Sequence, residues 1–269
     1  MLVESGPKDK AERRETLMKR SYWLALVALF VYGCDAARPV MPGKALPDAA
    51  SSISQRTVAQ EVITDYRGPS DTHAGPGPHP TTESDRYSFF NGGLQWFAGD
   101  AVEYRVVGTE PVSGANTAVV AGEQEWDALI ARRNFLRNDA TTQANPCTGL
   151  PNTITWASID GPGAVVGFTS PCYVLGTKEI VGFNITLDTD ESWGTSGAAT
   201  VIDVGDVATH EFGHAVGLGH VGAPRDGCLT MYKFVADGEI QKRTLGLGEK
   251  LGLAAVYGNT NITAGACGS

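Results

Sequence analysis

The sequence predicts an α+β domain in which helices pack on a twisted, mainly parallel sheet. Residues 101–107 alternate apolar and polar side chains, as a half-buried strand does. Residues 122–136 place large apolar side chains at helical spacing, which predicts an amphipathic helix. Further strands are expected at residues 153–159 and 180–188. Strands that alternate with a long helix favour a parallel sheet with helices on it.

An eleven-residue stretch carries the pattern H-E-F-G-H-A-V-G-L-G-H. Residues four positions apart share one face of an α-helix, so His210 and His214 can direct two imidazoles at one ion. Gly217 can adopt the left-handed conformation that ends helices and turn the chain, so that His220 approaches the same ion. These three histidines are therefore predicted to bind zinc. Ordinary helix histidines are the alternative, and they would have to match the whole pattern by chance.

Glu211 lies next to the first histidine and is not needed for coordination. From the neighbouring helix face its carboxylate can reach a water in the fourth position of the metal. Three neutral imidazoles leave the full charge on Zn²⁺, which can lower the pKa of that water to about 7. The helix is expected to begin near Asp203 or Asp206, because acidic residues suit a helix N-terminus.

At these residues the chain resembles the metzincin metallopeptidases, whose pattern H-E-x-x-H-x-x-G-x-x-H is followed by a methionine turn. Met231 lies in L-T-M-Y-K, which is similar to the L-M-Y-P of the matrixin branch, with Lys233 in place of proline. The resemblance implies a zincin-like catalytic domain with a cleft below the edge strand and a small C-terminal subdomain after His220. Residues 232–244 would then wall the pocket for a substrate side chain, and residues 245–258 would form the closing helix.

Two further segments, D-G-P-G and D-T-D-E-S-W, match elements that in matrixins contribute to a structural calcium site. Carboxylates and loop carbonyls are the hard oxygens that Ca²⁺ requires. By this resemblance the possible calcium residues are Asp160, Gly161, Gly163, Asp188 and Glu191. An ordinary turn and a solvated cluster of charges are the alternative. The second, structural zinc of that family is not expected, because Thr186 stands where a histidine ligand would.

The resemblance implies a monomeric zinc metalloendopeptidase that cleaves protein or peptide substrates. Glu211 would take the proton of the zinc-bound water and pass it to the departing amine. The alternative is a non-catalytic zinc-binding surface lipoprotein or adhesin. Glu211 argues against it, and a purely structural site would be closed by a fourth protein ligand. The cysteine switch of matrixins needs an upstream thiol, and only Cys34 is available; no other element that blocks the cleft is identified.

Residues 1–33 are typical of a secretory leader, in which Lys19 and Arg20 precede an apolar run too short for a typical membrane span. Met18 is a second possible start. The run ends V-Y-G-C, which resembles a bacterial lipobox, so Cys34 is expected to be lipidated and to anchor the protein to the membrane. Cleavage at a nearby small residue, with free secretion, is the alternative. The protein is thus expected in the bacterial cell envelope or outside the cell.

Residues 34–87 are rich in Pro, Ala, Ser and Gly and are predicted as a linker or short pro-segment, with a possible short helix at 52–66. The metallopeptidase domain is expected at residues 88–269. The chain of 269 residues has a net charge of −9 and no basic run beyond its N-terminus. Binding to nucleic acid is therefore not expected, because phosphate contacts need a cationic face.

Five cysteines occur in the chain, and Cys34 is the odd one. We expect disulfides between Cys147 and Cys172 and between Cys228 and Cys267, because each pair would join chain that is near in sequence or beside the active-site loop. A second zinc site is the alternative, but the spacing contains no C-x-x-C. Disulfides in turn imply an oxidising compartment.

Overall fold

The computed structural model describes residues 57–68, 84–130, 134–258 and 262. The chain divides into two units, Met1–Leu46 and Pro47–Ser269, and every described residue lies in the second. The predicted leader and Cys34, as well as Cys267, lie outside the described residues. Within the described ranges, no helix is long and apolar enough to cross a membrane.

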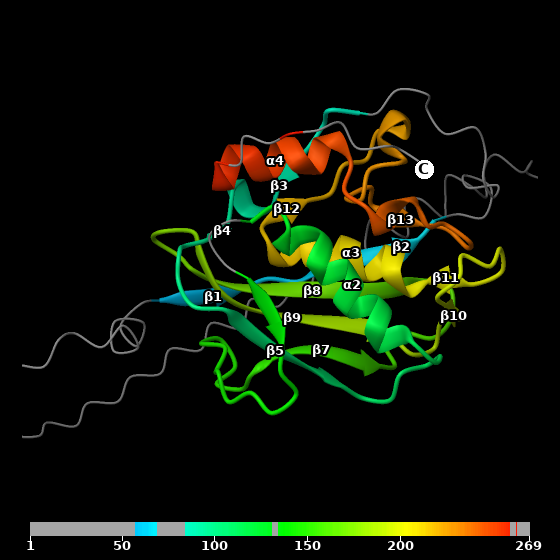
Figure 1. Ribbon diagram of the computed structural model, residues 1–269, viewed down its shortest axis with the longest axis horizontal. Coiled ribbons are helices and arrows are strands. Elements are labelled where there is room, and N and C mark those ends of the chain that lie inside the picture. Colours follow the sequence, from blue (N-terminus) through cyan, green and yellow to red (C-terminus); the bar gives the residue numbers. More distant parts are fainter. Residues whose placement is uncertain (1–56, 69–83, 131–133, 259–261, 263–269) are drawn as a thin grey trace, which may run out of the picture. The chain divides into compact units, whose positions relative to one another are not determined.

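The main sheet has nine strands among the described residues, and its central path runs β13-β2-β8-β9-β7-β5-β6 (Figure 1). Strand β1 pairs with β8, and β4 pairs with β9. The strands of this sheet are β1 (Val58–Gln60), β2 (Ile63–Arg67), β4 (Gln95–Trp96), β5 (Val102–Val107), β6 (Phe135–Arg137), β7 (Asn152–Ala157), β8 (Val165–Val174), β9 (Glu179–Asp188) and β13 (Phe234–Val235). Two small ladders pair β3 (Ser88–Phe89) with β12 (Leu218–Gly219) and β10 (Trp193–Gly194) with β11 (Ile202–Asp203).

The sheet is mixed and mainly parallel, as predicted. Strands β4, β5, β6, β7 and β9 pair in parallel, and so do β2 and β13. Strand β8 runs antiparallel to β9, and β1 and β2 run antiparallel to β8. The predicted strands at 101–107, 153–159 and 180–188 correspond to β5, β7 and β9.

Three α-helices lie among the described residues: α2 (Ala115–Asp127), α3 (Val204–Ala215) and α4 (Leu247–Tyr257). Single 3₁₀ turns occur at η2 (Phe90–Gly92), η3 (Pro224–Asp226) and η4 (Gln241–Arg243). Helix α4 ends at Gly258 in the left-handed conformation, within the predicted closing segment. Figure 1 shows α2 and α3 together on one face of the sheet, with α4 beyond them.

The predicted helix at 122–136 is displaced towards the N-terminus. Helix α2 begins after Gly114, whose φ is 86°, and ends at Asp127, while Phe135 belongs to a strand. Gly122 does not start the helix but lies in its middle, where α2 crosses α3. A Cβ at this position would lie 2.7 Å from the backbone nitrogen of Thr209. Glycine is needed there because the two helix backbones approach closely.

The expected linker is wrong for residues 57–68, which carry β1 and β2 rather than a tether or a short helix. The folded part of the chain therefore begins before residue 88. Strand β2 alternates in burial: Ile63 and Asp65 are buried, whereas Tyr66 is 38% exposed. The Pro- and Gly-rich composition of the surrounding stretch conceals this short β-branched segment. Its pairing with strands far along the chain decides its structure.

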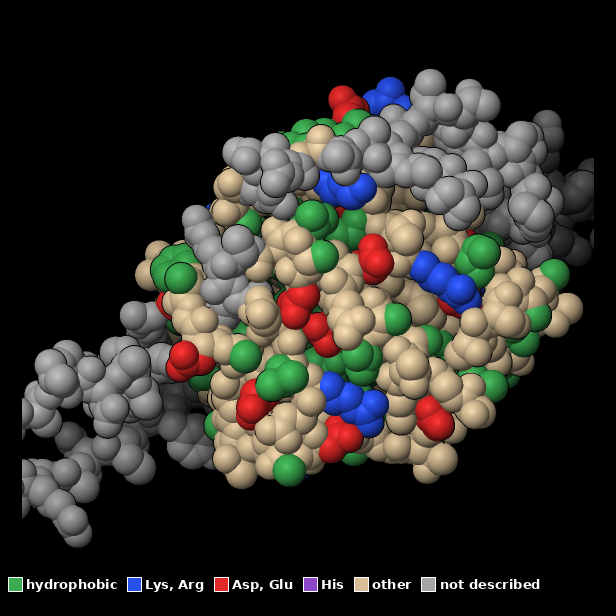
Figure 2. All heavy atoms as spheres, viewed as in Figure 1, with side chains coloured by type: hydrophobic (Ala, Val, Ile, Leu, Met, Phe, Trp, Pro, Cys, Tyr) green, Lys and Arg blue, Asp and Glu red, His purple; other side chains and the backbone are tan. Residues whose placement is uncertain are grey.

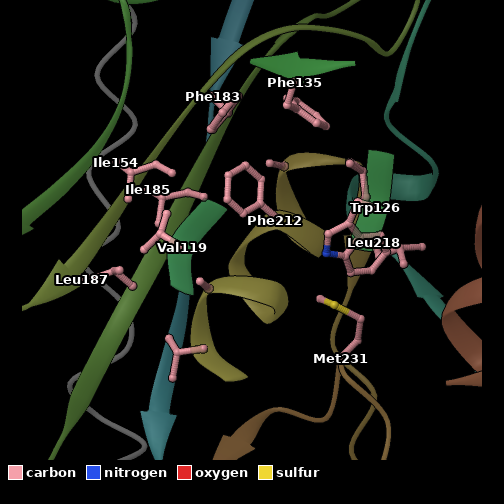
Figure 3. Close-up of a cluster of buried hydrophobic side chains, with 14 of the residues drawn as sticks. Val119, Trp126, Phe135, Ile154, Phe183, Ile185, Leu187, Phe212, Leu218 and Met231 are labelled. Atoms are coloured by element: carbon pink, nitrogen blue, oxygen red, sulfur yellow. The ribbon is translucent and has the colours of Figure 1, made fainter. Parts of the chain in front are cut away.

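The core lies between the sheet and α3. Phe212 projects from α3 towards Phe183 and Ile185 of β9 (Figure 3). Its ring centroid lies 5.7 Å from that of Tyr104 and 5.9 Å from that of Phe183. These aromatic contacts fix the rotation of α3 about its axis, because the opposite orientation would expose a fully buried ring.

A buried acidic cluster joins α2 to the sheet. The hydroxyl of Tyr104 donates to Glu123 Oε2 at 3.1 Å, and the carboxylate of Asp127 accepts the backbone N–H of Phe135 at 2.9 and 3.0 Å. Burial, followed by the charge of Asp127, raises the pKa of Glu123 to about 8. Glu123 therefore carries a proton in the folded protein at neutral pH.

We expect Glu123→Gln to raise the melting temperature at pH 8 relative to the unchanged chain, and to change it little near pH 4.5. A raised folded-state pKa gives stability that is fully present below the unfolded-state pKa and is lost as pH rises towards 8. Glutamine is neutral like protonated glutamate, so its buried contacts do not weaken as the pH rises. Thermal unfolding from pH 4.5 to 8 measures the difference. Asp100→Asn, at an exposed position, is the control. If the melting temperature of all three chains depends on pH in the same way, Glu123 does not have a raised pKa.

On the face drawn in Figure 2, acidic and basic side chains are interspersed, and no histidine is visible among the described residues. His210 and His214 are buried, with 4% and 0% of their surfaces exposed.

Candidate metal centre and active site

Helix α3 begins where the sequence predicts. Asp203 is its N-cap, and its Oδ1 accepts the backbone N–H of Asp206 at 3.1 Å. Arg243 holds the same carboxylate, with Nε 2.7 Å from Oδ1. All twelve residues of the helix are buried, so α3 is fixed at its start and along its length.

The turn after α3 requires glycine. Gly217 has a φ of 96°, and its N–H donates to the carbonyl oxygen of His214 at 3.0 Å. A Cβ here would lie 2.0 Å from the carbonyl oxygen of Leu94. No other residue type can occupy the position without moving the backbone. The chain then enters β12, which leads directly to His220.

The three predicted histidines converge. Nδ1 of His210 lies 2.5 Å from the carbonyl oxygen of Thr230, and Nδ1 of His214 lies 2.9 Å from that of Leu218. Because each Nδ1–H donates a hydrogen bond to one of these carbonyls, Nε2 is left unprotonated and its lone pair points to the common centre. The Nε2 atoms of His214 and His220 are 3.1 Å apart. Two nitrogens on one tetrahedral zinc are separated by about 3.4 Å, so the rings fit such an ion.

A fourth side chain, which the sequence analysis missed, occupies the position expected to be open. Asp65 Oδ1 lies 2.8 Å from His210 Nε2 and 2.5 Å from His220 Nε2, and Oδ2 lies 3.5 Å from His214 Nε2. The four ligand atoms lie within 4.8 Å of one another. Within the described ranges, this is the only group of three or more potential ligands of these types. Three nitrogens and one carboxylate oxygen form a donor set that suits zinc.

Burial and charge favour the protonation states that bind a metal. Burial lowers the pKa of His210 to about 4, so its ring is neutral at pH 7. Burial acts to raise the pKa of Asp65, but the positive charges that His210 and His214 can carry outweigh it and hold this pKa well below its usual range. The carboxylate is therefore ionised, as a zinc ligand must be.

Glu211 lies beside this cluster and is fully buried. Its Oε2 accepts the hydroxyl of Thr169 in β8 at 2.5 Å. Burial, followed by the charge of Asp65, raises the pKa of Glu211 well above its usual value. The two carboxylates thus face each other, and the favoured state gives the proton to Glu211 and the charge to Asp65.

Met231 packs beneath α3, where the predicted methionine turn places it. A Cβ on Gly213 would lie 2.2 Å from the Met231 sulfur, so the helix and the turn are in close contact. The backbone N–H of Met231 donates to Glu249 Oε1 at 3.0 Å, and its carbonyl accepts the N–H of Val221 at 2.9 Å. The turn therefore holds Val221, the residue that follows His220.

A pocket adjoins His210 and is lined in part by the predicted wall segment, residues 232–244. That segment contributes Tyr232, Phe234 and Lys242, and Val207 of α3 lines another side. The pocket lies next to the metal cluster, because Asp65 also lines it.

The predicted calcium residues are only partly brought together. Glu191 receives the backbone N–H of Gly163 on Oε1, and Arg67 Nη1 lies 3.0 Å from its Oε2. Asp188 Oδ1 accepts the N–H of Ile159 at 3.2 Å, while its buried Oδ2 has no hydrogen-bond partner. Asp160 accepts the N–H of Val165 at 3.3 Å. Calcium binding stays a prediction.

The predicted disulfide between Cys147 and Cys172 is present, with Cα atoms 5.8 Å apart. These two cysteines therefore cannot form the alternative second zinc site. Cys228 is also disulfide-bonded, and its partner lies outside the described residues. Cys267 stays the predicted partner.

The fold and the site together define a zinc metallopeptidase domain with a histidine triad. Residues 152–258 match the sequence profile of the Matrixin family, Peptidase_M10. No curated protein matches the chain. Among solved structures the chain is similar to two of myroilysin. One is 16% identical, covering 61% of this chain and 82% of that chain with a TM-score of 0.38. The other is 14% identical, covering 72% and 99% with a TM-score of 0.36.

Proposed function

We propose that the protein is a zinc-dependent endopeptidase that cleaves extracytoplasmic proteins. The observation that carries the proposal is the convergence of three Nε2 atoms beside a buried glutamate, next to β8 of the sheet. The edge of β8 that pairs with β2 could bind an extended peptide through backbone hydrogen bonds if the peptide took the place of β2.

Each residue of the site has a separate role in the proposed hydrolysis. His210, His214 and His220 would hold the metal through Nε2. When bound, zinc would supply a Lewis acid for the scissile carbonyl and lower the pKa of a water. A bound cation would favour the ionised form of Glu211. Its carboxylate would then take the proton from the attacking water and deliver it to the nitrogen of the departing amine. Thr169 orients the Glu211 carboxylate through its hydroxyl.

One observation favours a non-catalytic zinc protein: Asp65 supplies a fourth protein ligand, which is typical of structural sites. Against this reading, Asp65 comes from a strand outside the matched domain. A structural site also has no use for Glu211, whose burial is costly without a function. The two functions differ in whether the protein, once Asp65 no longer occupies the site, cleaves a substrate.

The test uses the full chain loaded with one equivalent of zinc and unfolded casein as the substrate, with Asp65→Ala alongside. We expect internal cleavage that is abolished by a chelator and restored by Zn²⁺. Mass spectrometry of the fragments identifies endopeptidase action. Full zinc occupancy in the Asp65→Ala chain without any cleavage would favour the non-catalytic function.

We also propose that the D-G-P-G loop and the segment from Asp188 to Glu191 bind Ca²⁺ for stability. The support is the orphaned Asp188 Oδ2 and the contact between Glu191 and Gly163. We expect millimolar Ca²⁺ to raise the melting temperature and Asp188→Asn to remove this increase. Thermal unfolding at a constant zinc concentration measures this increase in melting temperature. An unchanged calcium response in Asp188→Asn, with exposed Asp85→Asn as the control, would exclude this site.

We further propose that the protein is exported and anchored at Cys34. Support comes from the sequence alone, because the residues concerned lie outside the described ranges. Cell fractionation of the unchanged chain and Cys34→Ala tests the proposal: the variant should leave the membrane fraction. Equal membrane association of both chains would contradict lipidation.

A further inference from the structure

We propose that Glu191 and Asp237, here called the acidic pair, form a cation-binding subsite that selects substrates carrying arginine on the C-terminal side of the cleaved bond. The proposal rests on the proposed peptidase function and names the substrate class that this site would favour. Three observations carry it: the place of the acidic pair along the path of a bound peptide, the cation that the pair holds in this structure, and the burial of Glu191.

The acidic pair lies beside the path that a bound peptide would take. Strand β2 occupies this path, between β8 and β13. Asp65 of β2 reaches the three histidines. Arg67, two positions later, reaches both members of the acidic pair. Side chains two positions apart in a strand point to the same side. A peptide in the place of β2 that brings one residue to the metal would therefore place the second residue after it in the acidic pair.

Backbone hydrogen bonds on both sides of β2 set this register. The N–H of Arg67 donates to the carbonyl oxygen of Ala164 at 2.8 Å, at the start of β8. The N–H of Gly68 donates to the carbonyl oxygen of Val235 in β13 at 2.9 Å. Main-chain groups of almost any sequence can make these bonds. The backbone therefore sets the register of a replacing peptide, and the acidic pair discriminates between side chains at the position of Arg67.

A guanidinium group fills the acidic pair in this structure. Nη1 of Arg67 lies 3.0 Å from Oε2 of Glu191, and Nη2 contacts both carboxylate oxygens of Asp237. Two nitrogens of one planar group thus bind two carboxylates from different loops, which the single ammonium of lysine does less well. Two negative charges face one positive charge. The acidic pair therefore favours arginine over lysine, and lysine over neutral or acidic side chains.

Contacts that do not involve β2 hold both carboxylates in place. Oε1 of Glu191 accepts the backbone N–H of Gly163. Asp237 lies in a turn in which the N–H of Gly238 donates to the carbonyl oxygen of Val201 at 2.8 Å. These contacts can persist when another peptide takes the place of β2. The acidic pair is therefore preformed, so a substrate binds it at little cost in conformational ordering.

The burial of Glu191 makes the preference selective. Its side chain is 0% exposed, whereas that of Asp237 is 32% exposed. Within the described ranges, Arg67 is the only basic side chain that forms an ion pair with Glu191. A peptide with a neutral side chain at this position would leave a buried charge uncompensated, which is strongly unfavourable. A site built to bind a polar group rejects substrates that lack this group.

The first test does not depend on catalysis. Arg67→Ala removes the cation from the acidic pair, and ethylguanidinium, which resembles the lost group, is titrated into the zinc-loaded full chain. We expect a saturable rise in the melting temperature of Arg67→Ala that exceeds the rise in the unchanged chain, because the ligand binds the folded state. Ethylammonium should produce a smaller rise. Equal responses of Arg67→Ala and the unchanged chain to ethylguanidinium would overturn the proposal.

Arg137→Ala is the matched control. Arg137 binds a single carboxylate, that of Asp139, at 3.1 and 2.9 Å, and the side chain of Asp139 is 54% exposed. Ethylguanidinium should stabilise this variant no more than the unchanged chain. An equal rise in Arg67→Ala and Arg137→Ala would count against the acidic pair. Circular dichroism establishes whether each variant is folded, and if Arg67→Ala does not fold, the preference for cleavage sites decides the question.

The second test measures the substrate preference of the zinc-loaded full chain at a constant calcium concentration. Mass spectrometry maps the cut sites in unfolded casein. We expect arginine, and less often lysine, at one fixed position about two or three residues after the cut, because Arg67 follows Asp65 by two positions. Two long peptides that differ only in arginine or glutamine at that position are then compared. The arginine peptide should have a kcat/KM at least about tenfold higher.

Asp237→Asn should reduce the ratio of the two kcat/KM values, whereas Asp139→Asn, the matched control, should leave it unchanged. Asp237 is not among the possible calcium residues, so its replacement leaves that proposed site intact. A purely structural effect of Asp237→Asn would slow the cleavage of both peptides equally, and an unchanged ratio would therefore contradict the proposal.

The two tests distinguish failure of this proposal from failure of the proposed function. If no chain cleaves casein but ethylguanidinium selectively stabilises Arg67→Ala, the cation-binding subsite stands and the peptidase is refuted. If the chain cleaves casein without any enrichment of basic residues after the cut, the peptidase stands and the subsite is refuted.

Discussion

Replacing Glu211 by Gln is expected to lower kcat by at least about 10²-fold, the typical contribution of one positioned base. Zinc content should not change, because Glu211 is not among the four potential ligands. Glutamine keeps the shape and the contact with Thr169 but cannot accept the proton of the water. Initial rates and metal content are measured in the Asp65→Ala background, where no fourth side chain competes for the metal.

Glu110→Gln is the matched control, because it makes the same chemical change at the start of α2, where Glu110 accepts the N–H of Asn116. It should leave kcat within about twofold, as expected for a site distant from the chemistry. Undiminished turnover in Glu211→Gln would remove Glu211 from the mechanism and leave the identity of the base open.

Replacing His214 by Ala is expected to abolish zinc binding at micromolar metal and, with it, all cleavage. His214 is fully buried, and its Nδ1 is already held by the carbonyl of Leu218, so no neighbouring group can replace its Nε2. Metal binding to the folded state also stabilises it. A chelator should therefore lower the melting temperature of the unchanged chain but not that of the variant.

His79→Ala is the control for this change, because His79 lies outside the eleven-residue H-E-F-G-H-A-V-G-L-G-H stretch. It should retain zinc and respond to the chelator like the unchanged chain. Stoichiometric zinc in dialysed His214→Ala would show that the triad is not the binding site.

The triad could be predicted from the sequence because its geometry is local. His210, His214 and the turn at Gly217 are related by the helix repeat and by one left-handed residue, all within eleven positions. The fourth group could not be found in this way. Asp65 lies 145 positions before His210 and reaches it only through the pairing of β2 with β8. No local pattern encodes that pairing.

In the sheet, too, the strands that depend on distant partners could not be predicted from the sequence. Strands β5, β7 and β9 have long apolar or alternating segments and were predictable. Strand β8 was not predicted as a strand, although it is ten residues long and is the strand to which β2 pairs. The short β2 owes its structure to its two neighbours, and helix α2 was displaced because Gly122 looked like a boundary rather than a helix crossing. Partners far along the chain decide such cases.

The dependence of β13 on a single neighbour bears on which substrates the enzyme can recognise. Any polypeptide that replaces β2 has to bridge β8 and β13, and in doing so it restores the continuity of the sheet as far as the C-terminal part of the domain. The length of the substrate's main chain would then affect how well it binds. Short oligopeptides would not reach both strands, so we expect long unfolded chains to be cleaved faster than short oligopeptides.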